Sequence, residues 1–215
     1  MKTQNNNPYY VGVSRSGSHW IRLVLEGYLD GKSPISSFIA CKDDINVLHS
    51  RLNDFKGTHD MQLDFVYENV IYLYRNPIDC IFSNLKYDGT EITNKNEVDR
   101  YLNIWIAHIQ KWVYDEKFTK NKVILCYEKL RNYFVDEFSK LLSFLNIEIN
   151  ADKIVESNET YTKSKIREIV HDKKVINNEY DYEIQRKRFI ELFGEYIISK
   201  LPETHKTICE FPKLK

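Results

Sequence analysis

The stretch YYVGVSRSGSHWIRLVLEGYL, residues 9–29, decides the fold of this chain. Its first part, Tyr9 to Val13, is a short apolar run rich in residues that favour β-strands. The polar loop SRSGS at 14–18 follows, and apolar residues then recur at helical spacing from Trp20 to Leu29. The stretch therefore predicts a strand, a tight loop and a helix in direct succession.

The same pattern recurs further along the chain. Val70 to Tyr74 predicts a second strand, RNP at 75–77 predicts a turn, and the apolar spacing after it predicts a second helix. A third strand is predicted at 122–126, with further helices at 98–113, 134–146 and 183–200. Because strands alternate with helices, we predict one α/β domain, residues 1–215, whose mainly parallel sheet carries helices on both faces. The segment 150–182 is polar and poorly patterned, so we expect it to be mobile or ordered by a ligand.

The composition excludes several classes of protein. With 42% hydrophobic and 29% charged residues the chain suits one globular core, and its 31 basic residues balance 31 acidic ones. No net field therefore favours a nucleic acid or a membrane surface as partner. The sequence shows neither the apolar run of a signal peptide nor one long enough for a membrane span, which predicts a cytoplasmic protein. Its four cysteines are scattered, so we expect reduced thiols rather than a disulfide framework or a zinc site.

The loop at 14–19 is a candidate anion site. A loop between a parallel strand and a helix presents backbone N–H groups at the positive end of the helix dipole. Arg15 adds a fixed charge, Ser16 and Ser18 add hydroxyls, and Gly17 lets the backbone approach a ligand. Taken alone, the loop is equally consistent with an ordinary polar turn. It lacks the GxxxxGK[ST] spacing that binds a nucleoside triphosphate with Mg²⁺.

A second candidate anion site follows the second predicted strand. Arg75 follows that strand directly, and Ser83 lies eight residues later on the predicted helix, so both side chains can reach one phosphate. Proline and aspartate at the start of RNPID are also ordinary helix-start residues, and this motif taken alone indicates no more than that. The two sites together are much more informative than either motif alone.

These residues resemble the motifs of a known family, the sulfotransferases that use 3'-phosphoadenosine 5'-phosphosulfate (PAPS) as donor. SRSGSHW at 14–20 resembles the family's 5'-phosphosulfate loop, with Arg15 at the position of a lysine. RNPIDCIFS at 75–83 resembles the 3'-phosphate motif, with Arg75 and Ser83 at its binding positions. GTH at 57–59 resembles the segment of the catalytic histidine, and KVILCYEKL at 122–130 resembles the strand and turn near the adenine. The likeness covers about two-thirds of the chain, residues 8–147.

The resemblance implies the P-loop NTPase-like three-layer fold of sulfotransferases, PAPS as donor, 3'-phosphoadenosine 5'-phosphate (PAP) as product, and no metal. It implies as donor-binding residues Arg15, Ser16, Gly17, Ser18, His19, Trp20, Arg75, Ser83 and Tyr127.

The resemblance also implies two catalytic residues. Arg15 would stabilise charge on the departing phosphate, and His59 would take the proton of the acceptor. A single histidine in a polar stretch such as KGTHD is otherwise more often a surface residue, and His19 is the alternative base. Lys56 stands one residue away from the position of the family's lysine.

The chain departs from the family beyond residue 150. The family's RKGxxGDW-like segment, which clamps the 3'-phosphate, has no counterpart there. Basic residues do occur in that region, although such runs are more often solvated faces: Lys163, Lys165, Arg167, Lys173 and Lys174.

The acceptor is not specified by these motifs, since acceptor specificity comes from variable loops around the cleft. A saccharide and a small alcohol or phenol both remain open, with an amine as a further option. Tyr87, Trp105, Trp112 and Tyr161 are candidate walls of an acceptor site, although the helical spacing of the two tryptophans favours core positions. The alternatives are a P-loop nucleotide kinase, which would need a Walker lysine that the loop lacks, and a non-catalytic nucleotide-binding member of the family.

Overall fold

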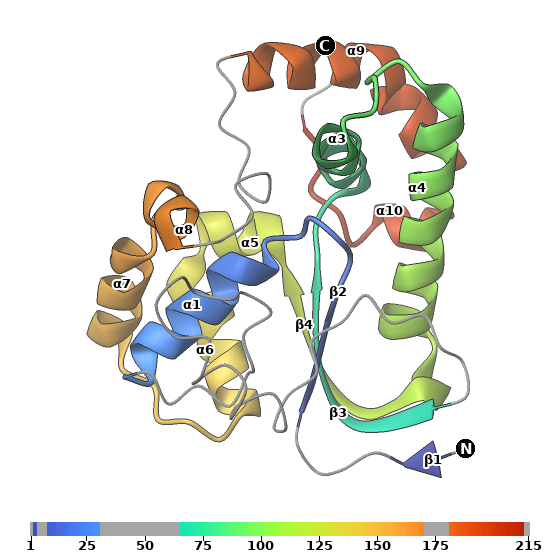
Figure 1. Ribbon diagram of the computed structural model, residues 1–215. Coiled ribbons are helices and arrows are strands. Elements are labelled where there is room, and N and C mark those ends of the chain that lie inside the picture. The colour runs from blue at the N-terminus through green and yellow to red at the C-terminus, as the bar shows by residue number, and fades with distance from the viewer. Residues whose placement is uncertain (1, 4–7, 31–64, 170–180, 213–215) are drawn as a thin grey trace.

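The computed structural model describes residues 2–3, 8–30, 65–169 and 181–212. In them a parallel sheet separates two groups of helices, which confirms the predicted α/β architecture (Figure 1). The strands are β1 (Lys2–Thr3), β2 (Tyr9–Gly12), β3 (Phe65–Tyr74) and β4 (Thr119–Cys126). The helices are α1 (Ser18–Tyr28), α3 (Pro77–Asp88), α4 (Lys95–Ile109), α5 (Tyr127–Asn132), α6 (Phe134–Phe144), α7 (Ala151–Thr160), α8 (Lys163–Ile169), α9 (Tyr182–Lys200) and α10 (Glu203–Lys206). A π-helical turn (Gln110–Tyr114) and a 3-10 turn (Glu116–Phe118) connect α4 to β4.

β3 is the central strand of the described sheet. It pairs in parallel with β1, β2 and β4, with Gly12 opposite Leu73 and Tyr74 opposite Cys126. The carboxyl ends of β2, β3 and β4 therefore meet at one edge, and the loops that leave them are neighbours. In open α/β sheets this edge is where ligands bind.

Alternation along β3 divides the core between the two faces of the sheet. Val70 and Tyr72 point into the core under α3, α4 and α9, whereas Ile71 and Leu73 point into the core under α1, α6 and α7. All four side chains are fully buried. Trp105 and Trp112 belong to the first of these cores, as their helical spacing predicted.

Most predicted elements are confirmed, with shifted ends. β3 and β4 begin earlier than predicted, because Phe65–Asn69 and Thr119–Asn121 extend the ladder although they are less apolar. The helix predicted at 98–113 begins at Lys95, capped by Asn94, and changes to π geometry at Gln110.

The described part of 150–182, which we expected to be mobile or ordered by a ligand, contains two helices that the sequence pattern did not predict. Residues 151–160 and 163–169 form α7 and α8. Asn150 caps α7 by accepting the N–H of Lys153 at 3.0 Å, and Ile154 is fully buried against the core. The mostly polar composition hid a narrow apolar stripe that a short helix needs. Within the described ranges, no helix is both long and apolar enough to cross a membrane.

Candidate active site

The loop that leaves β2 is held against the neighbouring strand. The N–H of Val13 donates to the carbonyl of Leu73 at 3.1 Å, and the N–H of Ser16 donates to the carbonyl of Val13 at 3.3 Å. Gly17 has a positive φ of 89° and Arg15 one of 68°. A non-glycine residue in this region costs about 1 kcal/mol or more, and such strain concentrates at functional sites. The loop thus turns tightly between β2 and α1.

The N-terminus of α1 has no side-chain cap among the described residues. Gly17 provides no side chain to cap it, and no acidic residue occurs in its first turn. Because the first turn of an α-helix directs its backbone N–H groups toward the helix N-terminus, α1 directs the N–H groups of residues 18–20 toward the loop. By contrast α3, α4 and α7 are each capped by an asparagine side chain.

The Ser16 side chain fits the same ligand chemistry. It is fully buried, and among the described residues its hydroxyl has no hydrogen-bond partner. A buried hydroxyl without a hydrogen-bond partner costs free energy, and an anionic oxygen close to the loop would offset this cost by accepting a hydrogen bond from it.

Arg15 brings the two predicted anion motifs together. Its Nε donates to the hydroxyl of Ser83 on α3 at 3.1 Å, and its guanidinium lies over the Tyr87 ring at 4.8 Å from the centroid. Burial lowers the pKa of Arg15, but a guanidinium stays protonated at neutral pH. Ser14 donates to Asn84 at 2.7 Å and fixes the loop on the same helix. The two motifs therefore form one site.

Arg75 stacks on the ring that touches the loop. Its guanidinium lies 4.6 Å from the centroid of Tyr127, the first residue of α5. A Cβ added to Gly17 would meet that ring at 2.7 Å, so the loop backbone and the ring are in close contact. The Tyr127 ring, which follows β4, thus contacts both Gly17, which follows β2, and Arg75, which follows β3, at the carboxyl edge of the sheet.

Two carboxylates neutralise Arg75 from a distance. Arg75 Nη2 is 3.7 Å from Asp79 Oδ2, and Arg75 Nε is 3.9 Å from Glu128 Oε1. Burial lowers the pKa of Arg75, but the Asp79 carboxylate and other acidic groups outweigh it and raise the pKa overall. Both distances exceed that of a hydrogen bond, and among the described residues Nε has no hydrogen-bond partner. The cation is thus held in place with donor capacity left for a ligand.

Arg186 of α9 takes the closer position on Asp79. Its Nε and Nη2 donate to the two carboxylate oxygens at 2.5 and 3.0 Å. Asn76 also donates to Asp79 and caps α3 by accepting the Asp79 N–H, each at 2.9 Å. Burial opposes ionisation of Asp79, but the Arg186 hydrogen bonds and the Arg75 charge lower its pKa overall. Asp79 therefore stays ionised and connects α3 to α9.

The pKa of Glu128 shifts in the opposite direction to that of Asp79. It accepts a hydrogen bond from the Asn76 side chain at 2.7 Å. Burial nevertheless raises its pKa overall, because it outweighs the hydrogen bonds and the charge of Arg75.

Trp20 forms an aromatic wall beside the loop. Its ring lies edge-on to Tyr127, with ring centroids 5.9 Å apart, and its indole N–H donates to Asn158 of α7 at 3.0 Å. This arrangement brings α7, an element that the sequence pattern did not reveal, to the edge of the site.

The described structure thus brings together seven of the predicted donor-site residues around the carboxyl ends of the strands: Arg15, Ser16, Gly17, Trp20, Arg75, Ser83 and Tyr127. Ser18 and His19 begin α1 in the same place. His59 and Lys56 lie outside the described residues, as do Lys173 and Lys174. The roles of all these residues remain predictions.

The four residues predicted as candidate walls of an acceptor site differ in their burial and position. Trp105 and Trp112 are buried in the core and form no wall. Tyr87 is partly exposed beside Arg15, and Tyr161 packs on Gly27 of α1, where an added Cβ would lie 2.5 Å from its ring.

Sequence reasoning missed the residues that hold the site from other elements. Asp79 and Glu128 lie within the quoted motifs, but the sequence pattern indicated only a helix start and a turn at these positions. The signal that could have identified them as site residues is their position beside a buried arginine. Arg186 and Asn158 lie 107 and 138 positions from their partners, and nothing in their local pattern identifies them.

Comparison with known proteins identifies the family and the fold of this chain. The chain matches the sequence model of the sulfotransferase domain over residues 62–190. No curated protein sequence matches it. Among solved structures it is similar to mouse sulfotransferase SULT7A1 complexed with PAP, with a TM-score of 0.55, 19% identity, and coverage of 92% of this chain and 86% of that one. It is also similar to retinol dehydratase in complex with androsterone and the inactive cofactor PAP, with a TM-score of 0.53, 11% identity, and coverage of 90% and 80%.

These two structures share the α/β fold of this chain at low sequence identity. The sequence model covers more than half of the chain. The chain therefore belongs to the sulfotransferase domain family.

Proposed function

We propose that this sulfotransferase uses PAPS as donor and transfers the sulfuryl group to a hydroxyl acceptor, either a saccharide or a small alcohol or phenol. The observation that carries the proposal is the position of Arg15 and Arg75, which approach Ser83 and Tyr127 at the carboxyl edge of the sheet. Two separate cations beside an uncapped helix N-terminus suit a ligand with two anionic groups. Both similar structures also contain PAP.

The donor's parts can be matched to separate residues. Arg75 and Ser83 would bind the 3'-phosphate, because Arg75 keeps a donor without a partner in the described structure. The 5'-phosphosulfate would lie against Arg15, the Ser16 hydroxyl and the backbone N–H groups of residues 17–20. Trp20 and Tyr127 would contact the adenine, since their rings form one wall beside the loop.

The chemistry follows from this placement. The acceptor oxygen forms a bond to sulfur while the bond between sulfur and the bridging phosphate oxygen breaks, and the electron pair of that bond stays on PAP. Arg15 and the loop N–H groups would stabilise the charge that develops on the bridging oxygen. His59 would accept the acceptor's proton. In-line positioning and charge stabilisation then supply most of the catalysis, as in phosphoryl transfer.

Calorimetric titration with PAP tests the donor, with ATP and Mg²⁺ as the competing ligand. We expect the wild-type protein to bind PAP, and we expect Arg75→Ala to weaken that binding by at least about tenfold, since it removes charge-assisted hydrogen bonds. Arg100→Ala is the matched control, because Arg100 is an exposed arginine on α4 that pairs with Glu97. Binding of ATP without binding of PAP would support a nucleotide kinase instead.

The base is tested separately from the donor. His59→Ala should abolish turnover with PAPS and a suitable acceptor while leaving the affinity for PAP within about twofold of wild type. Wild-type turnover in this variant would exclude His59 as the base and leave His19 as the alternative. Retained PAP binding by the wild type without turnover on a broad acceptor panel would indicate a non-catalytic member of the family.

A further inference from the structure

Arg15 is held from α3 by two residues that lie one helical turn apart. Its Nε donates to the hydroxyl of Ser83 at 3.1 Å, and its guanidinium carbon lies over the ring of Tyr87, 4.8 Å from the ring centroid. Ser83 and Tyr87 are separated by four positions on α3, so their side chains lie on the same face of that helix. A hydrogen bond and an aromatic ring therefore restrain one guanidinium from one helix face.

The two contacts differ in what they leave to a ligand. The bond to Ser83 occupies Nε of Arg15, and in the proposed function the same hydroxyl also contacts the 3'-phosphate of the donor. The ring of Tyr87 attracts the cation through its π electrons, and this contact needs no acceptor atom. The ring therefore restrains Arg15 without taking part in donor binding itself, and the guanidinium can still donate to a phosphate.

The surroundings of Arg15 favour a strong contact with this ring. Burial is the main effect that lowers the pKa of Arg15, so its guanidinium is partly desolvated. A cation over an aromatic ring gains more free energy where water is excluded than at an exposed site. Tyr87 itself is 36% exposed, so its replacement removes the ring without opening a cavity in the core.

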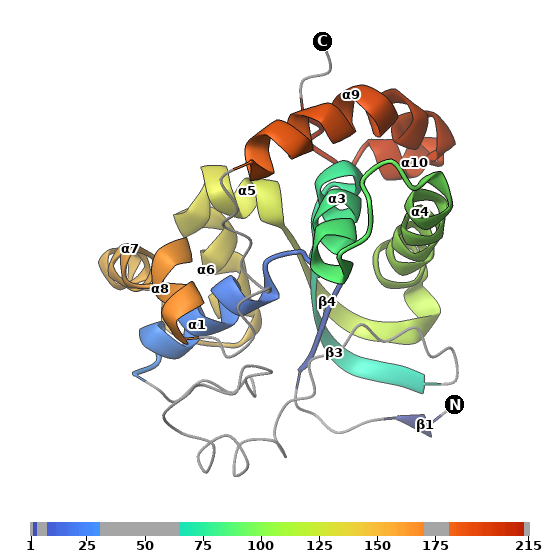
Figure 2. The same ribbon diagram turned by 45° about the horizontal axis from the view of Figure 1, so that its top comes forward.

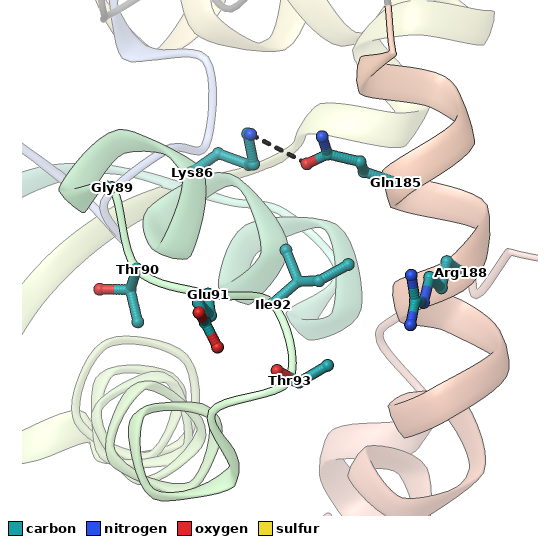
Figure 3. A pocket seen from close by; sticks show the side chains of 8 residues that line it. All are labelled: Lys86, Gly89, Thr90, Glu91, Ile92, Thr93, Gln185 and Arg188. Atoms are coloured by element: carbon teal, nitrogen blue, oxygen red, sulfur yellow. Dashed lines mark hydrogen bonds between the residues drawn. The ribbon is translucent and has the colours of Figure 1, made fainter.

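The preceding residue of α3, Lys86, is directed to another part of the molecule. Its Nζ donates to Gln185 Oε1 of α9 at 2.9 Å, as Figure 3 shows. Both residues line an open pocket with a cavity volume of about 470 Å³, and none of the predicted donor-site residues lines it. In the first turn of α9, Tyr182 packs against Phe82 of α3 with ring centroids 5.0 Å apart. Lys86 thus contributes to the contact with α9, whereas Tyr87 contributes to the contact with the loop.

We propose that Tyr87 is a positioning residue for Arg15, and that its ring holds the guanidinium where Arg15 binds the 5'-phosphate of the donor. The proposal rests on the proposed function and adds to it a residue that contacts no part of the donor itself. It also gives a physical reason for the arginine at position 15, where the related motif has a lysine. A guanidinium stacks on aromatic rings and keeps several donors for a phosphate, whereas an ammonium is a compact, strongly hydrated charge.

The test compares PAP with adenosine 3'-monophosphate, which lacks the 5'-phosphate, by calorimetry at one fixed salt concentration. Tyr87→Leu should weaken PAP binding by about three- to tenfold and adenosine 3'-monophosphate binding by less than about twofold. Tyr87→Phe keeps the ring and should hold the affinity for PAP within about twofold of wild type. Tyr133→Leu is the matched control, because Tyr133 is a 61% exposed tyrosine between α5 and α6. It should change neither affinity.

A double-mutant cycle with Arg15→Ala shows whether the ring acts through the arginine. Once the guanidinium is removed, Tyr87 has nothing to position. Adding Tyr87→Leu to Arg15→Ala should therefore weaken PAP binding by less than about twofold further. A three- to tenfold further loss in this background would mean that the ring acts independently of Arg15, which would overturn the proposal.

The outcomes separate this proposal from the donor assignment. Wild-type protein that binds PAP beside a Tyr87→Leu variant of equal affinity would overturn this proposal alone. An equal loss of both ligands in Tyr87→Leu would also overturn it, because the ring would then not act on the 5'-phosphate. Wild-type protein that binds neither ligand would overturn the donor assignment and this proposal together.

Discussion

Gly17 stands where the loop, the α1 N-terminus and the Tyr127 ring meet. Its φ of 89° and a distance of 2.7 Å between an added Cβ and the ring leave no room for a side chain. Gly17→Ala should therefore lower the free energy of unfolding by about 1–3 kcal/mol. It should also weaken PAP binding by more than about tenfold, because the ring displaced by the new methyl group supports Arg75. Urea unfolding and calorimetry measure the two effects.

Gly89→Ala separates backbone strain from the ring contact. Gly89 also has a positive φ, 70°, but an added Cβ there would meet nothing within 4 Å. This variant should lose only about 1 kcal/mol of stability and keep its affinity for PAP. A Gly17→Ala variant that behaved like Gly89→Ala in both measurements would show that the ring does not constrain the loop.

Asp79 makes part of the stability dependent on pH. Its pKa in the folded protein is below the ordinary value of 3.8, so its ion pair with Arg186 stabilises the fold above that value. The contribution is lost as the pH falls through the lower pKa of the folded state. Asp79→Asn should cost about 2 kcal/mol at pH 7, toward the low end for a buried pair because Arg186 is partly exposed.

Urea unfolding of the wild type and of Asp79→Asn at about pH 7, 5 and 3 measures this dependence. The difference in unfolding free energy between the wild type and Asp79→Asn should be the same at about pH 7 and 5 and smaller at about pH 3. An equal gap at all three would mean that the carboxylate charge contributes nothing.

At the scale of elements, α7 shows why a polar segment folds without a ligand. Ile154 is fully buried in the core beside α1 and α6, whereas the adjacent Val155 is 42% exposed. Ile154→Ala should lower the free energy of unfolding of the ligand-free protein by about 2–4 kcal/mol, because it leaves a cavity. Val155→Ala should change it by less than about 0.5 kcal/mol. Equal, small effects for both variants without donor would support a segment that becomes ordered only around a ligand.

The strand-loop-helix units could be predicted because each carries its signal within about twenty residues. The continuous apolar run from Val70 to Tyr74 and the helical spacing after Trp20 both report local geometry. The donor-site residues Arg15, Arg75 and Ser83 could be selected because they follow strands and match motifs of a known family. The hydrogen bond that joins Arg15 to Ser83 could not be predicted, because 68 residues separate the two in the sequence.

The contribution of α9 was also beyond the reach of the sequence. Tyr182 and Arg186 were predicted only as part of a helix near the C-terminus. Their function as contacts of α3 depends on how α9 packs across the molecule, and no local pattern encodes that packing.

At the scale of the whole molecule, the C-terminal elements are built into the core. α9 lies across α3 and α4 in both views (Figure 1, Figure 2), and its Phe189 and Ile197 are fully buried in the core of that face. The Tyr74 hydroxyl donates to the carbonyl of Ile208 at 2.7 Å. β3 contributes side chains to both cores, so unfolding of either group of helices would expose one face of the sheet to solvent.

We therefore expect the whole chain, residues 1–215, to unfold in one cooperative transition, as a single domain does. The tryptophans allow a test of the two faces, because Trp20 of α1 packs against one core while Trp105 of α4 and Trp112 of the π-helical turn are buried in the other. In a Trp20→Phe variant, tryptophan fluorescence reports only the α4 face, and far-ultraviolet circular dichroism reports all helices. The two urea midpoints should coincide, since the faces share β3. Separate midpoints would mean that the two faces unfold independently and that the chain contains two domains.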